Sequence, residues 1–286
     1  MKKVIVLGGS GQLAQCIQSV QCEDLDIRCL NSQQANILEE RHLREVFENY
    51  HPEIVINCAA YTAVDMAEDE PLKAAAINSQ APKLVAQLCM EYDASLIHIS
   101  TDFVFDGKSA NPLKEDDFPN PINTYGKTKL LGEEAIISTL DNHIIIRTSW
   151  LYSEFGNNFL KTMIRLGLER DEMGIVFDQL GTPTYAMDLA NVIIEIAQLD
   201  TPTYGLYHYS NEGAASWYDF AHSIFKYADI NIQLKPIRTF QYPTKAIRPA
   251  YSIMDKTKIK QTFDIAIPHW QDSLERCIKN SCIKNI

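Results

Sequence analysis

Short apolar runs alternate with longer amphipathic segments through the first half of the chain. The apolar runs cover residues 4–7, 27–30, 54–58, 96–99 and 144–146. Apolar residues at helical spacing fill the intervals at 11–21, 39–50, 71–92 and 124–139. Strands that are apolar throughout, when they alternate with helices, are typical of a parallel sheet covered on both faces. The pattern therefore predicts an α/β fold with a doubly wound parallel sheet, in which ligands bind beyond the carboxyl ends of the strands.

The alternation loosens after Trp150. Helical patterns remain near 157–170, 186–198 and 216–228, but loops that contain glycine or proline separate them. No composition typical of a flexible linker interrupts the chain. We therefore expect a sheet domain over 1–150 and a smaller α/β lobe over 151–286 that is built against it, with earlier segments also lining the cleft between them.

The charge and hydropathy of the chain exclude several classes of protein. Its 286 residues contain 26 Lys and Arg against 37 Asp and Glu, which gives a net charge of −11. A nucleic-acid-binding protein would carry a basic surface, so no nucleic-acid partner is expected. No segment reaches the roughly 18–20 apolar residues that cross a bilayer, so no membrane association is expected. The 7 cysteines are scattered without a C-x-x-C pair, which favours reduced thiols in the cytoplasm and indicates no metal site.

A glycine-rich turn follows the first predicted strand. Residues 8–14 read Gly-Gly-Ser-Gly-Gln-Leu-Ala and connect this strand to the first predicted helix. Gly8 and Gly11 allow a tight turn, which brings backbone amides at the helix N-terminus to a pyrophosphate. An ordinary turn can have the same composition, but this position in the first β-α-β unit favours a Rossmann-type domain over 1–150 that binds NAD(P).

The end of the second predicted strand bears on which dinucleotide is bound. NAD-binding sheets of this type carry a carboxylate there, which binds the adenosine ribose. Residues 28–33 read Arg-Cys-Leu-Asn-Ser-Gln, so a 2′-phosphate meets no negative charge, and Arg28 or the pair Asn31 and Ser32 can hold it. NADPH is therefore favoured. NADH stays open, because the same residues are consistent with a solvent-exposed edge.

A catalytic group is indicated at the carboxyl edge of the sheet. Tyr125 and Lys129 lie four residues apart in a predicted helix, so their side chains project from one face. A phenol has a pKa of about 10 in water, and a neighbouring ammonium lowers it. Thr101 follows the strand 96–99, and the small residues of 57–62 follow the strand before it. The pair alone would suit a surface helix, but together these residues indicate a site where a flat cofactor ring lies against 57–62.

These residues resemble the extended short-chain dehydrogenase/reductases, and further segments narrow the resemblance to the dTDP-4-dehydrorhamnose reductase family. The segments that carry it are 57–68, 100–107, 147–152, 156–159, 178–184 and 248–249. The resemblance implies reduction of the C4 ketone of dTDP-4-dehydro-L-rhamnose by NADPH or NADH. The product would be dTDP-L-rhamnose, used for rhamnose-containing polysaccharides, and relatives suggest a homodimer.

The resemblance also implies roles for individual residues. Tyr125 would protonate the developing alkoxide, Lys129 would bind the nicotinamide ribose and lower the Tyr125 pKa, and Thr101 would orient the ketone. The residues implied in cofactor binding are Gly8, Gly11, Gln12, Leu13, Asn31, Ala59, Ala60, Thr62, Tyr125 and Lys129. The residues implied in binding the dTDP-sugar are Thr101, Asp102, Phe103, Trp150 and Arg248.

Some residues of these segments have a purely structural interpretation as well. Trp150 would also suit core packing, and Arg248 would also suit a surface salt bridge. Asp65 and Glu68 are interpreted as residues that cap a helix start or complement its dipole. His98 lies within a predicted strand and is interpreted as buried scaffold.

Two other functions remain open. A sugar-nucleotide dehydratase or epimerase of the same superfamily is one, but dehydratases have Asp and then Glu after the active-site Thr, whereas Asp102 and Phe103 follow Thr101 here. A non-catalytic regulatory subunit is the other. It would tolerate loss of the catalytic groups, yet Thr101, Tyr125 and Lys129 are all present. The sequence therefore favours a reductase.

Overall fold

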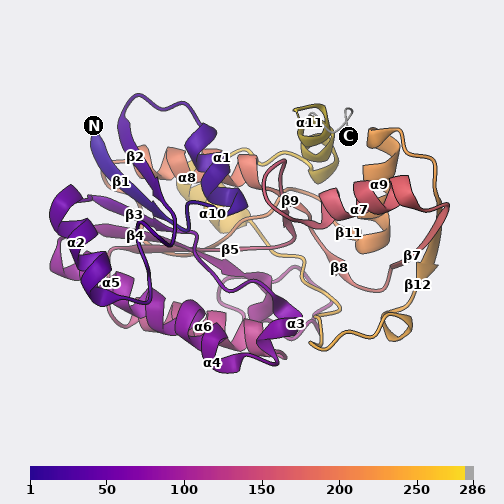
Figure 1. Ribbon diagram of the computed structural model, residues 1–286, viewed down its shortest axis with the longest axis horizontal. Helices are drawn as coiled ribbons and strands as arrows, with labels where there is room; N and C mark the ends of the chain where they lie inside the picture. The colour runs from indigo at the N-terminus through magenta and orange to yellow at the C-terminus, as the bar shows by residue number, and fades with distance from the viewer. Residues whose placement is uncertain (281–286) are drawn as a thin grey trace.

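Six strands form the central sheet of the computed structural model, which describes residues 1–280 (Figure 1). Every neighbouring pair in this sheet is parallel. In spatial order the strands are β10 (Gly205–His208), β5 (His143–Thr148), β4 (Ser95–Thr101), β3 (Ile54–Asn57), β1 (Lys2–Leu7) and β2 (Leu25–Leu30). The five predicted strands all lie in this sheet, and the predicted doubly wound Rossmann-type fold is confirmed.

Helices cover both faces of the sheet. One apolar core joins the sheet to α1 (Gln12–Ser19), α8 (Ala186–Gln198) and α10 (Thr257–Phe263). The other core joins it to α2 (Glu40–Tyr50), α5 (Ala81–Glu91) and α6 (Thr124–Ile137). In β1, Val4 and Val6 belong to the first core and Ile5 and Leu7 to the second, which is the alternation of a strand buried on both faces. No helix within residues 1–280 is long and apolar enough to cross a membrane.

The predicted helix over 71–92 contains an irregular turn. The structure divides it into α4 (Pro71–Ala75), a π-helical turn η1 (Ala76–Gln80) and α5. Within this turn, the Asn78 side chain accepts the N–H of Tyr61 at 2.8 Å and donates to its carbonyl oxygen at 3.1 Å. The π turn therefore fixes the loop between β3 and the short helix α3 (Val64–Ala67), at the carboxyl edge of the sheet.

The second half of the chain builds a smaller lobe beside the sheet (Figure 1). Its apolar core packs α7 (Phe159–Glu169), α9 (Trp217–Ala228) and α11 (Trp270–Asn280) together. Its strand pairs are β6 (Leu151–Tyr152) with β9 (Thr184–Tyr185), β8 (Leu180–Gly181) with β11 (Ala215–Ser216), and β7 (Glu172–Val176) with β12 (Gln233–Ile237). Two short 3-10 helices, η2 (Asp102–Val104) and η3 (Thr239–Gln241), complete the elements of the chain's described part.

The chain passes between the two units more than once. Strand β10 joins the central sheet beside β5, and α8 packs on α1, although both elements follow residue 150. The predicted range 151–286 therefore supplies part of the sheet domain as well as the lobe. Residues 281–286, which include Cys282, lie outside the described residues.

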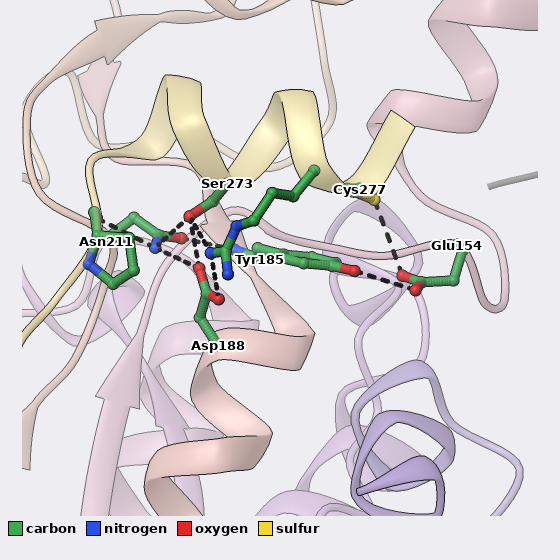
Figure 2. Close-up of polar contacts among 8 residues, drawn as sticks. Glu154, Tyr185, Asp188, Asn211, Ser273 and Cys277 are labelled. Atoms are coloured by element: carbon green, nitrogen blue, oxygen red, sulfur yellow. Dashed lines mark hydrogen bonds and ion pairs between the residues drawn. The ribbon is translucent and has the colours of Figure 1, made fainter. Parts of the chain in front are cut away.

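A buried polar network fastens the C-terminal helix α11 to the rest of the protein (Figure 2). Asp188, in the first turn of α8, accepts hydrogen bonds from the Asn211 amide at 2.8 Å and from the Ser273 hydroxyl of α11. Beside it, the Tyr185 hydroxyl donates to Glu154 at 3.0 Å. Because the Asp188 carboxylate has several hydrogen-bond partners, part of the cost of burying it is offset, and its contacts hold α11 in place.

A buried ion pair joins α6 to two strands of the sheet. Arg147 on β5 contacts Glu133 on α6, with 2.7 Å between Nη2 and Oε2. The side chains are only 3% and 1% exposed, respectively. The Ser100 hydroxyl of β4 donates to the same carboxylate. This pair fixes α6 across the ends of β4 and β5, where the catalytic group was predicted.

We predict that Glu133→Ala lowers the free energy of unfolding by about 3–5 kcal/mol, because it leaves the Arg147 charge buried without its partner. Chemical denaturation followed by circular dichroism measures the change. The control is Glu169→Ala, which breaks the exposed pair with Arg165 and should cost less than about 1 kcal/mol. Equal losses in the two variants would contradict the structural role assigned to the buried pair.

Candidate active site

A cleft of about 590 Å³ opens at the carboxyl ends of β1, β3, β4 and β5 and extends to the second lobe. The residues of the sheet domain that line it include Gly11, Gln12, Leu13, Ala60, Thr62, Thr101, Asp102, Phe103, Tyr125 and Lys129. Segments beyond β5 add Ser149, Trp150, Leu151, Gly156, Asn157, Trp217 and Arg248. Most of the residues predicted from the sequence therefore meet in one place.

Three predicted cofactor residues, Gly8, Asn31 and Ala59, lie outside the described lining of the cleft. Gly8 has a φ of +82°, and a Cβ there would lie 2.7 Å from the backbone nitrogen of Ala59, so the β1–α1 turn requires glycine. Asn31 accepts the backbone N–H groups of Gln33 and Gln34 at 2.9 and 3.1 Å. These residues shape the turn and the loop beside the cleft, and their contact with a cofactor stays a prediction.

The N-terminus of α1 faces the cleft and has the character of an anion site. Gly11 is the N-cap residue and provides no side-chain hydrogen bond to the helix. The first amides of a helix have no acceptor within the helix, so they favour a negatively charged group. Gln12 and Leu13 at this end both line the cleft. The arrangement fits the pyrophosphate of a dinucleotide.

Helix α6 begins in a way that places Tyr125 beside the end of β4. The Asn123 side chain caps the helix by accepting the N–H of Gly126 at 2.8 Å. Glu68 accepts both the N–H and the hydroxyl of Thr124, at 2.7 and 2.8 Å. Glu68 therefore binds at a helix start, as interpreted from the sequence, but that helix is α6 and not α3, at whose C-terminal end Glu68 lies. A Cβ on Gly126 would clash with the carbonyl oxygen of Phe103, so the helix packs directly on η2.

The Tyr125 phenol lies against the Thr101–Phe103 segment. The rings of Tyr125 and Phe103 meet edge to face with 5.6 Å between their centroids. Burial raises the pKa of Tyr125 to about 12, and a hydrogen bond with Thr101 acts in the opposite direction. The pKa of Tyr125 is therefore raised overall, because burial outweighs the hydrogen bond with Thr101; the lowering of this pKa by Lys129 stays a prediction. The phenol remains protonated at neutral pH, which is the form that donates a proton.

Lys129 is buried and points at strand β4. Its Nζ donates to the Ile99 carbonyl oxygen at 2.7 Å and lies 3.1 Å from His98 Nε2. Burial lowers the pKa of Lys129 to about 8, against the opposing charge of Glu133. His98 is fully buried, as predicted, but it contacts Lys129 and is not inert scaffold. Its position inside an apolar strand gave no sign of this contact.

Asp102 supplies a buried carboxyl group to the cleft. Thr101 donates to its Oδ1 atom at 3.1 Å, whereas its Oδ2 atom has no partner in hydrogen-bond geometry among the described residues, although the nearby Ser252 hydroxyl acts to lower the pKa of this carboxyl. Burial raises the pKa of Asp102 to about 6. A ligand hydroxyl would satisfy the unpaired oxygen. Within residues 1–280, no group of three or more His, Cys, Asp or Glu side chains could hold a metal ion.

Two stacked indole rings form the wall of the cleft on the side of the second lobe. The rings of Trp150 and Trp217 lie 3.6 Å apart and are nearly parallel, at 9°. Trp150 has a φ of +46°, which directs its ring across Gly181, where any side chain would strike it. Trp150 therefore packs against other residues of the protein and also lines the cleft. Sequence analysis missed Trp217, because the first residue of α9 carried no motif.

Arg248 lines the cleft and pairs with α3 of the sheet domain. Its Nη2 atom lies 2.6 Å from Asp65 Oδ2, so the salt bridge that the sequence left open is present. A second cavity of about 610 Å³ lies in the lobe, shares Arg248 and Trp217 with the cleft, and is further lined by Gln179 and Arg170.

We predict that Gly126→Ala destabilises the protein by about 1–3 kcal/mol, because the added methyl group forces α6 away from η2. Thermal and chemical unfolding measure the loss. The control is Lys127→Ala, an exposed position in the same helix turn, which should change stability by less than about 0.5 kcal/mol. A stable Gly126→Ala variant would show that the helix can move away without cost.

Comparison with known proteins gives a consistent result. The sequence model of the family described as "RmlD substrate binding domain" matches residues 1–283. The dTDP-4-dehydrorhamnose reductase of Aggregatibacter actinomycetemcomitans is 38% identical over 287 residues, covering 96% of this chain and 98% of that protein. The dTDP-4-dehydrorhamnose reductase of Escherichia coli K12 is 40% identical over 244 residues, covering 82% of this chain and 81% of that protein.

A solved structure extends the similarity to the fold. The crystal structure of the dTDP-4-dehydrorhamnose reductase from Bacillus anthracis in complex with NADP superimposes with a TM-score of 0.93 and is 39% identical in sequence. The match covers 98% of this chain and 99% of that one. Together with the cleft that brings Thr101, Tyr125 and Lys129 together, these similarities establish that the chain belongs to the dTDP-4-dehydrorhamnose reductase family.

Proposed function

We propose that the protein reduces the C4 ketone of dTDP-4-dehydro-L-rhamnose to give dTDP-L-rhamnose, with NADPH as the reductant. The observation that carries the proposal is the meeting of a protonated phenol, a buried lysine and an anion-binding helix N-terminus in one cleft. A reductase needs these three parts, because the ketone oxygen must gain a proton while the dinucleotide is held beside it. Membership of the family supplies the substrate class.

The cleft fits NADPH as the cofactor. When bound, NADPH supplies the hydride that the ketone carbon accepts. The amides at Gly11, Gln12 and Leu13 would hold the pyrophosphate, with Ala60 and Thr62 along the cofactor. Residues 28–33, at the end of β2 and the start of the following loop, include Asn31 and no carboxylate, so they do not oppose a 2′-phosphate. NADH would bind the same pyrophosphate site and would lack only the contact of the 2′-phosphate with this segment.

Tyr125 is assigned as the proton donor. Its phenol is protonated at neutral pH and lies against Thr101, whose hydroxyl would orient the ketone oxygen. Lys129 reaches the same cleft from one helical turn further along α6. It would bind the cofactor ribose and return a proton to Tyr125. These are the roles that hydride reduction requires from the protein.

The remaining wall residues would bind the sugar nucleotide. Asp102 offers an unpaired carboxylate oxygen to a sugar hydroxyl, and Phe103 and Trp150 offer ring faces to the sugar. Arg248 would contact the diphosphate, since its guanidinium forms charge-assisted hydrogen bonds with phosphate oxygens. The cavity that Arg248 shares with the cleft would receive the nucleoside.

The rival functions are less consistent with the site. A dehydratase of this superfamily needs a Glu after Asp102, where Phe103 packs against the Tyr125 ring instead. A regulatory subunit would not need the three groups that meet in the cleft. We further propose that the enzyme acts in the cytoplasm, as a homodimer, and that its product feeds synthesis of a rhamnose-containing polysaccharide.

We predict that Tyr125→Phe reduces kcat by about 100-fold to 10,000-fold, because the alkoxide loses its proton donor while the ring still fills the cleft. NADPH absorbance in the presence of dTDP-4-dehydro-L-rhamnose measures the rate. The control is Tyr61→Phe, which removes a phenol that donates to Glu70 outside the cleft and should leave kcat within about twofold. A Tyr125→Phe variant as active as the wild type would remove Tyr125 from the mechanism.

We predict that Arg248→Met raises KM for the sugar nucleotide by about 10-fold to 100-fold, since a charge-assisted hydrogen bond contributes about 1.5–3 kcal/mol. The kcat value should change little, because Arg248 contacts a non-reacting part of the substrate. Asp65→Asn serves as the matched variant: it weakens the salt bridge but keeps the guanidinium. If both variants raise KM equally, the salt bridge and not the diphosphate contact is the cause.

A further inference from the structure

His98 forms the middle of a buried polar chain that ends in the cleft. Its Nδ1 atom lies 3.2 Å from Asn57 Nδ2 and its Nε2 atom lies 3.1 Å from Lys129 Nζ. His98 lies on β4, Asn57 on β3 and Lys129 on α6, and all three side chains are almost fully buried. Lys129 alone of the three lines the cleft. This series of contacts therefore connects Asn57 and His98 of the sheet with Lys129, which is assigned to catalysis.

The orientation of the Asn57 amide follows from its neighbour. The backbone N–H of Ala59 donates to Asn57 Oδ1 at 3.1 Å. Because a backbone N–H can only donate, the oxygen of the amide must face Ala59 and the NH₂ group must face His98. An amide NH₂ group can only donate as well, so Nδ1 of His98 is the acceptor. A neutral imidazole with an accepting Nδ1 carries its proton on Nε2.

The Nε2–H of His98 consequently points at the nitrogen of Lys129. An ammonium group has three donors and no acceptor, so the contact would set two donors against each other. An amine has a lone pair, which accepts from Nε2–H while one of its own N–H bonds donates to Ile99. Resting on the function proposed above, we propose that His98, oriented by Asn57, is a positioning residue that favours the amine form of Lys129 over its ammonium form.

The charges around the pair are consistent with this role. Burial and the charge of Lys129 hold the pKa of His98 well below its usual range, so the ring is neutral, as the argument requires. Burial lowers the pKa of Lys129, whereas Glu133 and Cys58 act in the opposite direction. The carboxylate of Glu133 is shared with Arg147, which weakens its hold on Lys129.

This contact makes Lys129 a better proton donor during reduction. When the O–H bond of Tyr125 breaks and its proton moves to the substrate alkoxide, the phenolate takes a proton from the Lys129 ammonium. An N–H bond of Lys129 breaks in that step and an amine remains. The amine then accepts the hydrogen bond of His98 and regains its proton from water in the cleft. A donor whose pKa lies near the working pH transfers protons efficiently.

The tautomer of His98 tests the proposal without any enzyme assay. Long-range ¹H–¹⁵N NMR of protein labelled in histidine distinguishes a protonated ring nitrogen from an unprotonated one, and His98→Gln identifies the signal. We expect His98 to be neutral with its proton on Nε2 between pH 6 and pH 8. A proton on Nδ1, or a doubly protonated ring, would overturn the proposal.

The pH dependence of kcat tests the consequence. In the wild type, kcat should fall as pH rises through the Lys129 pKa, because the ammonium is lost. In Asn57→Asp, the new carboxylate would accept a hydrogen bond from His98 Nδ1, which moves the ring proton from Nε2 to Nδ1. In His98→Gln, the amide oxygen can face the Lys129 ammonium and accept a hydrogen bond from it. In both variants, the fall in kcat should occur about one pH unit higher than in the wild type, and kcat at pH 7 should be lower.

His143→Gln is the matched control. His143 is the first residue of β5, at the end of the strand away from the cleft, and its Nδ1 contacts the Leu140 carbonyl oxygen. In this variant, kcat should fall at the same pH as in the wild type. The proposal is contradicted if the fall in kcat occurs at the wild-type pH in Asn57→Asp and His98→Gln, or if it shifts equally in His143→Gln. A wild type that does not oxidise NADPH would contradict the proposed function instead, while the NMR result would still decide the tautomer of His98.

Discussion

The close approach of helix α6 to the carboxyl end of β4 is the constraint on which the site depends. Two glycines of this helix make the approach possible: a Cβ on Gly126 would clash with the Phe103 carbonyl oxygen, and one on Gly132 with the Asn78 carbonyl oxygen. The buried pair of Glu133 and Arg147 then ties the helix to the sheet. Tyr125 and Lys129 are brought to Thr101 and His98 because the backbone is held this tightly.

The same burial sets the protonation states of the catalytic groups. Low polarity disfavours charge, so the pKa of Tyr125 rises while the pKa of Lys129 falls. The two shifts suit a proton donor and the group that replenishes it. A protein with a net charge of −11 must nevertheless bind two anionic molecules, the dinucleotide and the sugar nucleotide. We propose that binding relies on local donors, such as the amides after Gly11 and the Arg248 guanidinium, and not on long-range attraction.

Features that depend on local pattern could be predicted from the sequence, and those that depend on distant contacts could not. The apolar runs gave the strands of the sheet, and the glycine turn gave the start of α1. Strand β10 was not predicted, because its short segment 205–208 gains its identity only by pairing with β5. Trp217 and the His98 contact were missed for the same reason. The raised pKa of Tyr125 could not be predicted either, because a sequence shows a neighbouring lysine but not the depth of burial.

The transfer of a labelled hydride tests the central claim most directly. NADPH that carries deuterium at the transferable position of the nicotinamide would be incubated with the protein and dTDP-4-dehydro-L-rhamnose, and the product sugar would be analysed by NMR. The account predicts dTDP-L-rhamnose with deuterium at C4. A product without deuterium at C4, or deuterium at another carbon of the sugar, would contradict it.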